Sequence, residues 1–168
     1  MPIIHGSISD FGKNISYIVE DRLNEIGDNV CKSMKEHLMQ PNDPYKRPHV
    51  DTGALLGSIR QETENYGDKV VTNIYADAQS ESGAFYAEFL EYGTGEFREG
   101  GGGATEPWRY KDSHGEWHTT TGMHADPFIE PSVDENVPAI GYTIAKEIEK
   151  YARMNEGGLI DHNHPNWF

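Results

Sequence analysis

The chain has only one cysteine, Cys31, among its 168 residues, so it can form no disulfide bond within itself. It also lacks any run of about 20 apolar residues, the length that a membrane-spanning helix requires. Its first residues show no basic start, long apolar stretch or cleavage site of the kind found in a secretion signal. These absences predict a protein that is made, and at least initially kept, in a cytoplasm and has no membrane partner.

Basic residues are scarce as well. The chain has 14 lysines and arginines against 28 aspartates and glutamates, which gives a formal net charge of −14. Such a charge repels phosphate groups and argues against tight binding to nucleic acid or to anionic membranes. Two interpretations of the acidity stay open. It either keeps the protein in solution or lines a passage through which DNA slides without adhering.

Apolar residues are few for a globular chain, at 36%, whereas there are 18 glycines and nine prolines. The length is that of one domain, which is enough to bury a core. We therefore expect one modest α+β core with long loops. Cys31 falls within a helical pattern, where a small buried side chain is a better interpretation than a reactive thiol.

The longest regular pattern lies between Asp10 and Met39, where apolar residues recur at steps of three and four. This spacing predicts an amphipathic helix roughly 40 Å long. Ser9 or Asp10 is placed to cap its start, and Pro41 prevents its continuation. Residues 40–49 then predict an irregular linker. The apolar stripe consists of Ile15, Ile18, Val19, Leu23, Ile26, Val30, Met34 and Leu38.

A second stripe predicts a helix from Pro131 to Met154, with a restart at Pro138 and an end at Gly157–Gly158. Residues 156–168 predict a C-terminal arm whose apolar side chains need a surface on which to dock. The helical stripe consists of Val133, Val137, Ile140, Ile144, Ile148 and Tyr151.

Between the helices, alternating residues predict two β-hairpins. The first joins 61–65 to 69–78 through a turn at 65–68, and its buried face stays open because both faces carry apolar residues. The second spans 108–122 around a Ser-His-Gly turn. We expect aromatic pairs to stabilise this second hairpin, formed by Trp108, Tyr110 and Trp117.

Two short helices complete the pattern. In the first, within residues 50–60, Asp51 or Thr52 caps the start. In the second, Phe85 to Tyr92, we expect Phe85, Phe89 and Tyr92 to share one side, with Tyr86 and Leu90 beside them. Gly93 then stops the helix in a left-handed conformation. The glycine-rich residues that follow, 96–106, predict a flexible loop.

Residues suited to catalysis are hard to find. The glycine run from Gly100 to Gly103 is not followed by Lys-Ser/Thr, so it is no phosphate-binding loop. The acidic pairs are as frequent as the composition alone produces, and Glu88 with Glu91 is the best of them. His114, His118 and His124 could hold a metal ion with an acidic residue, but no pair has the spacing of a known metal motif. We expect no enzyme, no cofactor and no metal, and keep a metal-dependent hydrolase as the rival.

Three segments together resemble the tail-completion, or head–tail joining, proteins of long-tailed bacteriophages. Residues 50–59, VDTGALLGSI, are similar to the family's Thr-Gly-x-Leu-x-x-Ser-Ile run. Residues 86–94, YAEFLEYGT, are similar to its Tyr-Ala-x-x-x-Glu-Tyr/Phe-Gly-Thr run. Residues 127–132, PFIEPS, are similar to its Pro-Phe-Leu-x-Pro-Ala, with Ser132 where alanine is usual. The motif residues are Thr52, Gly53, Leu55, Ser58, Ile59, Tyr86, Glu91, Tyr92, Gly93, Thr94, Pro127, Phe128 and Pro131.

Most of these residues also have a structural interpretation. Thr52 caps and Gly53 turns, while Leu55, Leu56 and Ile59 anchor a short helix. Glu91 lies one turn before Gly93, so we expect its carboxylate to accept bonds from the loop amides at the Gly93–Thr94 corner. Pro127 and Pro131 bracket Phe128 and direct its ring into the core.

The resemblance implies a virion protein of the phage neck, assembled in the host cytoplasm as a homo-oligomeric ring, hexameric by expectation. The ring would join a head-side connector or stopper protein to the tail terminator or tail tube, around a channel through which DNA passes. A tail terminator or a head-closure stopper is the alternative. The candidate partner contacts are Phe97, Trp108, Tyr110, Trp117, Trp167 and Phe168, which could equally be ordinary core aromatics.

The predicted fold is therefore α+β: an antiparallel sheet of about four strands packed against a long helix near each end of the chain. Residues 1–155 are expected to form a single domain. Within it, 40–49 are a linker and 96–124 are a glycine-rich loop with a hairpin insert. Residues 156–168 are the arm.

Overall fold

The computed structural model describes residues 8–40, 52–80, 83–112, 114–138 and 140–159. Its helices are α1 (Ile8–Met39), α2 (Ala54–Ser58), α3 (Tyr86–Tyr92), α4 (Ile129–Asn136) and α5 (Ile140–Leu159). Its strands are β1 (Ile59–Asn65), β2 (Val70–Ala76), β3 (Thr94–Gly95), β4 (Trp108–Lys111), β5 (Trp117–Thr120) and β6 (Gly122–Met123). The predicted α+β class, with a long helix near each end of the chain, is confirmed.

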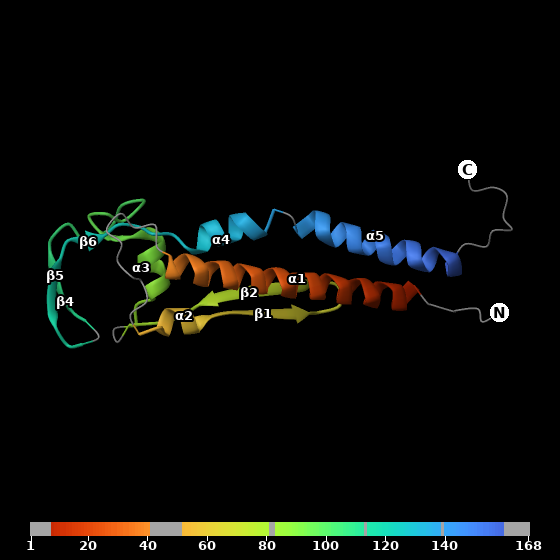
Figure 1. Cartoon of the computed structure of the whole chain (residues 1–168), viewed down its shortest axis with the longest axis horizontal. Helices are drawn as coiled ribbons and strands as arrows, with labels where there is room; N and C mark the ends of the chain where they lie inside the picture. Colours follow the sequence, from red (N-terminus) through yellow and green to blue (C-terminus); the bar gives the residue numbers. More distant parts are fainter. Residues whose placement is uncertain (1–7, 41–51, 81–82, 113, 139, 160–168) are drawn as a thin grey trace.

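The strands do not form one sheet of about four strands, as the sequence had led us to expect. They form three antiparallel pairs: β1 with β2, β3 with β6, and β4 with β5. Figure 1 shows the reason, because the β4–β5 hairpin lies at the far end of an elongated molecule, away from β1 and β2. Each hairpin is local in sequence, and nothing in the described part of the chain brings their edges together.

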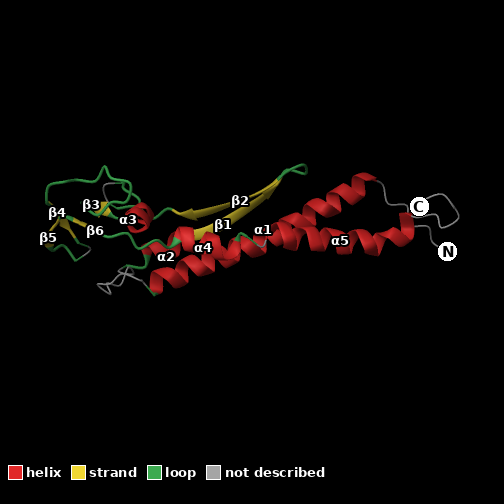
Figure 2. Ribbon diagram, turned by 90° about the horizontal axis from the view of Figure 1, so that it is seen from above, coloured by secondary structure: helices red, strands yellow, loops and turns green. Residues whose placement is uncertain are grey.

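Helix α1 is the central layer of the molecule. The β1–β2 hairpin runs along one side of it, and α4 and α5 run along the opposite side (Figure 1). The view from above shows the same elongated stack, with the start of α1 and the end of α5 at one end (Figure 2). There the rings of Phe11 and Tyr151 lie 5.4 Å apart, and Asn14 donates a hydrogen bond to the Tyr151 hydroxyl at 2.7 Å.

The apolar core lies around the second half of α1. It brings together residues of α1, the α2–β1 junction, α3 and the start of α4, with Phe128 only 1% exposed. Burial raises the pKa of the Cys31 thiol, in keeping with the small buried side chain predicted at this position. The core residues are Val30, Cys31, Met34, Leu38, Leu55, Ile59, Ala87, Leu90 and Phe128.

The first predicted hairpin is confirmed, and the structure settles which face is turned to α1. Gln61 donates to the side chains of Asn24 and Asp28, and Asn65 donates to Glu20 at 2.7 Å. Since residues two apart share a face, the register places Val70, Thr72, Ile74 and Ala76 on this same side. The face toward α1 is therefore polar on β1 and largely apolar on β2.

The predicted restart at Pro138 is confirmed, because the C-terminal helix divides there into α4 and α5. Both predicted ends are wrong. The helix begins at Ile129 rather than Pro131, and it continues past Gly157–Gly158 to Leu159. Proline has no amide hydrogen and disrupts the preceding turn, which accounts for the break. Pro131 does not break α4 because it lies in the first turn, where a backbone N–H would have no partner within the helix.

Two predicted segments fall largely or wholly outside the described residues. These are the linker at 40–49, of which only Gln40 is described, and the end of the arm, including Trp167 and Phe168. The arm's first residues, up to Leu159, belong to α5. None of the helices in the described ranges combines the length and the apolar character that crossing a bilayer needs.

Candidate interaction site

The corner between α3 and α4 depends on one buried carboxylate. Glu91, 6% exposed, accepts hydrogen bonds from the amides of Phe128 and Ile129 at 2.9 Å and from the amide of Glu130 at 2.8 Å. These amides open α4 and have no partner within the helix. A carboxylate at a helix N-terminus is also favoured by the helix dipole. Glu91 therefore ties the second family-like segment to the third.

This arrangement corrects one expectation. Glu91 was expected to bond amides of the Gly93–Thr94 corner, but its partners belong to α4. The buried side of α3 carries Ala87, Leu90 and Glu91, whereas Phe85 and Tyr92 are 44% and 51% exposed. A charged side chain can be buried here because the three amides of α4 supply its hydrogen-bond partners.

Gly93 ends α3 with a positive φ, as expected, but not in the left-handed helical conformation. Its φ is 71° and its ψ is 179°, a region that essentially only glycine occupies. Beyond it, Gly95 pairs with Gly122 in the short β3–β6 ladder. A Cβ on Gly95 would lie 1.9 Å from the Thr121 carbonyl oxygen, and one on Gly122 would lie 2.0 Å from that of Thr94. Backbone packs directly on backbone here.

The glycine-rich loop has two parts. Gly100, Gly101 and Gly102 all have positive φ and open space where a side chain would be. Gly103 differs, because a Cβ there would lie 1.9 Å from the Gly95 carbonyl oxygen. The base of the loop is held by an ion pair of 2.7 Å between Arg98 and Glu88. The open tip matches the predicted loop, while its two ends pack against β3.

The first family-like segment joins the same core. Thr52 accepts a hydrogen bond from the Ala54 amide at 3.3 Å, and Gly53 turns the chain with a φ of 75°. Leu55 and Ile59 are buried, as predicted. In the third segment Ser132 is fully buried and donates to the Phe128 carbonyl at 2.6 Å, so the serine is satisfied where the family usually has alanine.

The β4–β5 hairpin exposes two of the predicted contact residues. Tyr110 and Trp117 are 46% and 60% exposed. The predicted aromatic pairing is wrong, because Tyr110 lies opposite His118 and Trp117 lies opposite Lys111. Trp108 is half-buried opposite Thr120, and the Phe97 ring lies 4.0 Å from that of His124. Of the described candidates, Tyr110 and Trp117 are thus the most available to a partner.

The turn of this hairpin is organised by Asp112. Its carboxylate pairs with His118 Nε2 at 2.8 Å and accepts the amides of Glu116 and His114. The hydrogen bond from His118, and then that from Glu116, hold the pKa of Asp112 below its ordinary value. In the described part of the chain no three histidine, cysteine or acidic side chains are grouped so as to hold a metal ion. The three candidate histidines thus form no such group there.

The structure also reveals a groove that no sequence pattern had indicated. It encloses about 410 Å³ between α1, β2 and the break between α4 and α5, and its lining is mainly apolar. The principal apolar side chains are Leu23, Ile26, Val30, Val70, Ile74 and Val137. The apolar residues on both faces of β2 are a weak signal of such a groove and do not locate it.

Comparison with known proteins does not extend this description. No protein-family model, no curated protein and no solved structure matches the chain. The site is therefore defined by its own geometry: a rigid corner around Glu91, an exposed aromatic hairpin and an open apolar groove.

Proposed function

We propose that the chain is a structural protein of the bacteriophage neck, a tail-completion subunit that joins head to tail. One observation carries the proposal beyond the resemblance itself. The three family-like segments, far apart in sequence, meet in one core through Leu55, Leu90 and Phe128, and Glu91 bonds the second to the third. A shared core gives the three segments a common structural role, which supports treating them as one motif set.

In the proposed role the protein acts by binding alone. The core corner holds the β4–β5 hairpin at one end of the molecule, where Tyr110 and Trp117 are exposed. Exposed aromatic side chains supply much of the energy of protein interfaces. The hairpin and the glycine loop are the proposed contacts with neighbouring rings, and the subunit itself would form a ring, hexameric by family resemblance.

The net charge of −14 supports a second part of the proposal. An acidic channel wall repels the DNA backbone and lets it pass without adhering. A ring whose channel wall is neutral or basic would contradict this part and leave the joining role intact.

The decisive experiment deletes the gene from the phage genome that encodes the chain. A tail-completion role predicts filled heads and finished tails of normal length that fail to join, visible by electron microscopy and restored by the wild-type gene in trans. Tails of uncontrolled length would instead indicate a terminator, and heads that lose DNA a stopper. Normal infectious particles would contradict every neck role.

A parallel measurement addresses the rival. Elemental analysis of the purified protein should find no stoichiometric zinc or manganese. A stoichiometric metal that disappears in a His118→Ala variant would favour the hydrolase and contradict the proposal.

A further inference from the structure

Strand β2 has a free edge. It pairs with β1 on one side and, among the described residues, with no strand on the other. The apolar groove lies along this edge, and Ile74 remains 37% exposed there. An unpaired strand edge is a template for a further strand, and an added strand would cover the groove beside it.

A segment that binds in the groove should be apolar on one face, because the groove is lined mainly by apolar side chains that cannot pair with a charge. The floor of the groove is the α1 stripe of Leu23, Ile26 and Val30. The stripe on the opposite side of α1 carries Asp21, Glu25, Asp28 and Lys32, by the helical spacing of three and four. A second copy that docked this charged stripe in the groove would bury charges against apolar side chains. A contact between two identical grooves avoids that cost.

We propose that β2 of one subunit pairs antiparallel with β2 of a second copy, about a twofold axis at Asn73. The full overlap of Val70–Ala76 with itself fixes this register, because 73 is the middle of the strand. Val71 then lies opposite the second copy's Tyr75, and Thr72 opposite its Ile74. Such β-branched and aromatic neighbours stabilise paired strands. The result is a four-stranded antiparallel sheet shared by two chains.

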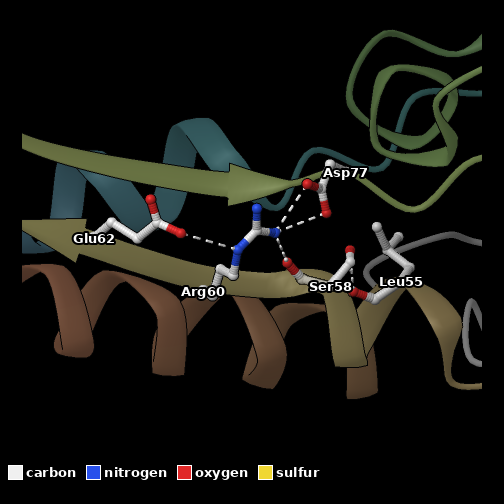
Figure 3. Close-up of polar contacts among 5 residues, drawn as sticks. All are labelled: Leu55, Ser58, Arg60, Glu62 and Asp77. Carbon is white, nitrogen blue, oxygen red and sulfur yellow. Dashed lines mark hydrogen bonds and ion pairs between the residues drawn. The ribbon is translucent and has the colours of Figure 1, made fainter.

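The charges flanking β2 fit this register. Lys69 precedes the strand and Asp77 follows it, so the twofold axis places each lysine opposite the second copy's aspartate. In Figure 3, Asp77 lies at the end of β2, where both its oxygens are 2.9 Å from one guanidinium nitrogen of Arg60. A carboxylate has about four acceptor positions, which leaves room for a lysine as well. Opposite charges on facing strands are favourable.

The spacing of the layers fits too. Two strands occupy about 9.6 Å, twice the usual distance between neighbours in a sheet. Packed helices lie about 8–10 Å apart. If each hairpin stays packed on its own α1, the distance between the two hairpins in the shared sheet therefore equals a normal packing distance between the two α1 helices. The partly exposed Leu23 and Ile26 of each α1 would then face those of the second copy and close both grooves.

This inference does not depend on the proposed function. A twofold pair cannot be repeated around a ring with distinct head and tail faces, because both partners use the same surface. The pair would therefore be the form of the free subunit.

The first test uses charge reversal in the full-length chain. Wild-type protein at tens of micromolar should sediment as a dimer. Lys69→Glu alone and Asp77→Lys alone each place two like-charged pairs in the interface, and each should weaken dimerisation about tenfold or more. An equimolar mixture of the two variants restores both opposite-charge pairs and should recover the dimer.

The second test is a disulfide cross-link, which can trap the pair even if the dimer is weak. In the proposed pair the Asn73 Cα atoms face each other at about 4.5–5.5 Å, within the disulfide range of about 4.4–6.8 Å. Asn73→Cys should therefore oxidise to a covalent dimer. Glu62→Cys is the matched control, since Glu62 faces Asn73 from β1 and lies three strand spacings, about 14 Å, from its counterpart.

Wild-type protein that remains monomeric would overturn the inference and assign the groove to a different partner. Dimers that both charge variants retain, or that cross-link equally through position 62, would overturn the β2 register. Circular dichroism of each variant checks folding, which matters most for Asp77→Lys because it also removes one of the two acidic partners of Arg60.

Discussion

The two halves of this elongated molecule are held together by different forces. Around the second half of α1 the contacts are apolar and deeply buried, with Phe128 and Val30 almost inaccessible. Along the first half, α1 contacts its neighbours through hydrogen bonds, such as Asn65 to Glu20 and Asn14 to Tyr151, and an open groove lies beside the middle of the helix, from Leu23 onward. The difference suggests a division of labour in which one half fixes the fold and the other leaves surface for assembly.

The comparison is tested most severely by removing Phe128. Phe128→Ala leaves a cavity in the apolar half and should lower the free energy of unfolding by about 3–5 kcal/mol, measured by chemical denaturation. Tyr142→Ala on α5, where the tyrosine is 66% exposed, should change it by less than about 0.5 kcal/mol. Comparable losses for the two variants would mean that the halves do not differ as described.

The next largest effect is expected at Glu91. Glu91→Gln replaces a charged acceptor of three amides with a neutral one that also brings an NH₂ group among donors. We expect a loss of about 2 kcal/mol, the scale of hydrogen bonds to charged groups. Glu99→Gln, an exposed change in the loop, serves as control and should be nearly neutral. A neutral Glu91→Gln would show that the capping of α4 contributes little.

Two glycines of α1, Gly12 and Gly27, differ in how closely neighbouring side chains pack against them. At Gly12 nothing lies within 4 Å of an added Cβ, so Gly12→Ala should stabilise the helix by up to about 1 kcal/mol. At Gly27 a Cβ would lie 3.0 Å from the Thr72 methyl group and 3.1 Å from Gln61 Cγ. Gly27→Ala should therefore lose that gain or destabilise. Equal stabilisation by both would show that the hairpin moves away from α1 easily.

The smallest effect is the pH response of the β4–β5 turn. Asp112 has a pKa below its ordinary value of 3.8, mainly through its hydrogen bond with His118. Its contribution is therefore complete above about pH 4 and is lost as the pH falls through the lowered pKa. NMR signals of the hairpin should shift in that acidic window, and Asp112→Asn should abolish the shift. A response centred near neutral pH would contradict the assignment to Asp112.

The sequence predicted what local periodicity and turn chemistry determine. The apolar stripe of α1 and the turn at Asn65–Asp68 are strong local signals, and both elements formed where expected. The long-range partners were not predictable in this way. Nothing near Glu91 in the sequence indicates the amides of residues 128–130, because they lie 37 to 39 residues further along the chain.

The groove was missed for a related reason. A period-two pattern does not distinguish a strand that is covered on its inner face from one that is only partly covered. Whether Val70 and Ile74 are buried depends on how far α1 extends beneath β2, which is a property of the packing. The number of strands in a sheet depends likewise on which hairpins meet, and here they do not.

The continuity of α1 has a mechanical consequence. Its 32 residues make a rod of about 48 Å that is anchored in the core at one end and carries the β1–β2 hairpin along its length. A rotation of about 5° at the anchored end displaces the other by about 4 Å, close to the distance between paired strands. The β1–β2 hairpin is attached part-way along this rod, at Glu20 and Asn24, so the same rotation moves its strands by a smaller distance than the free end.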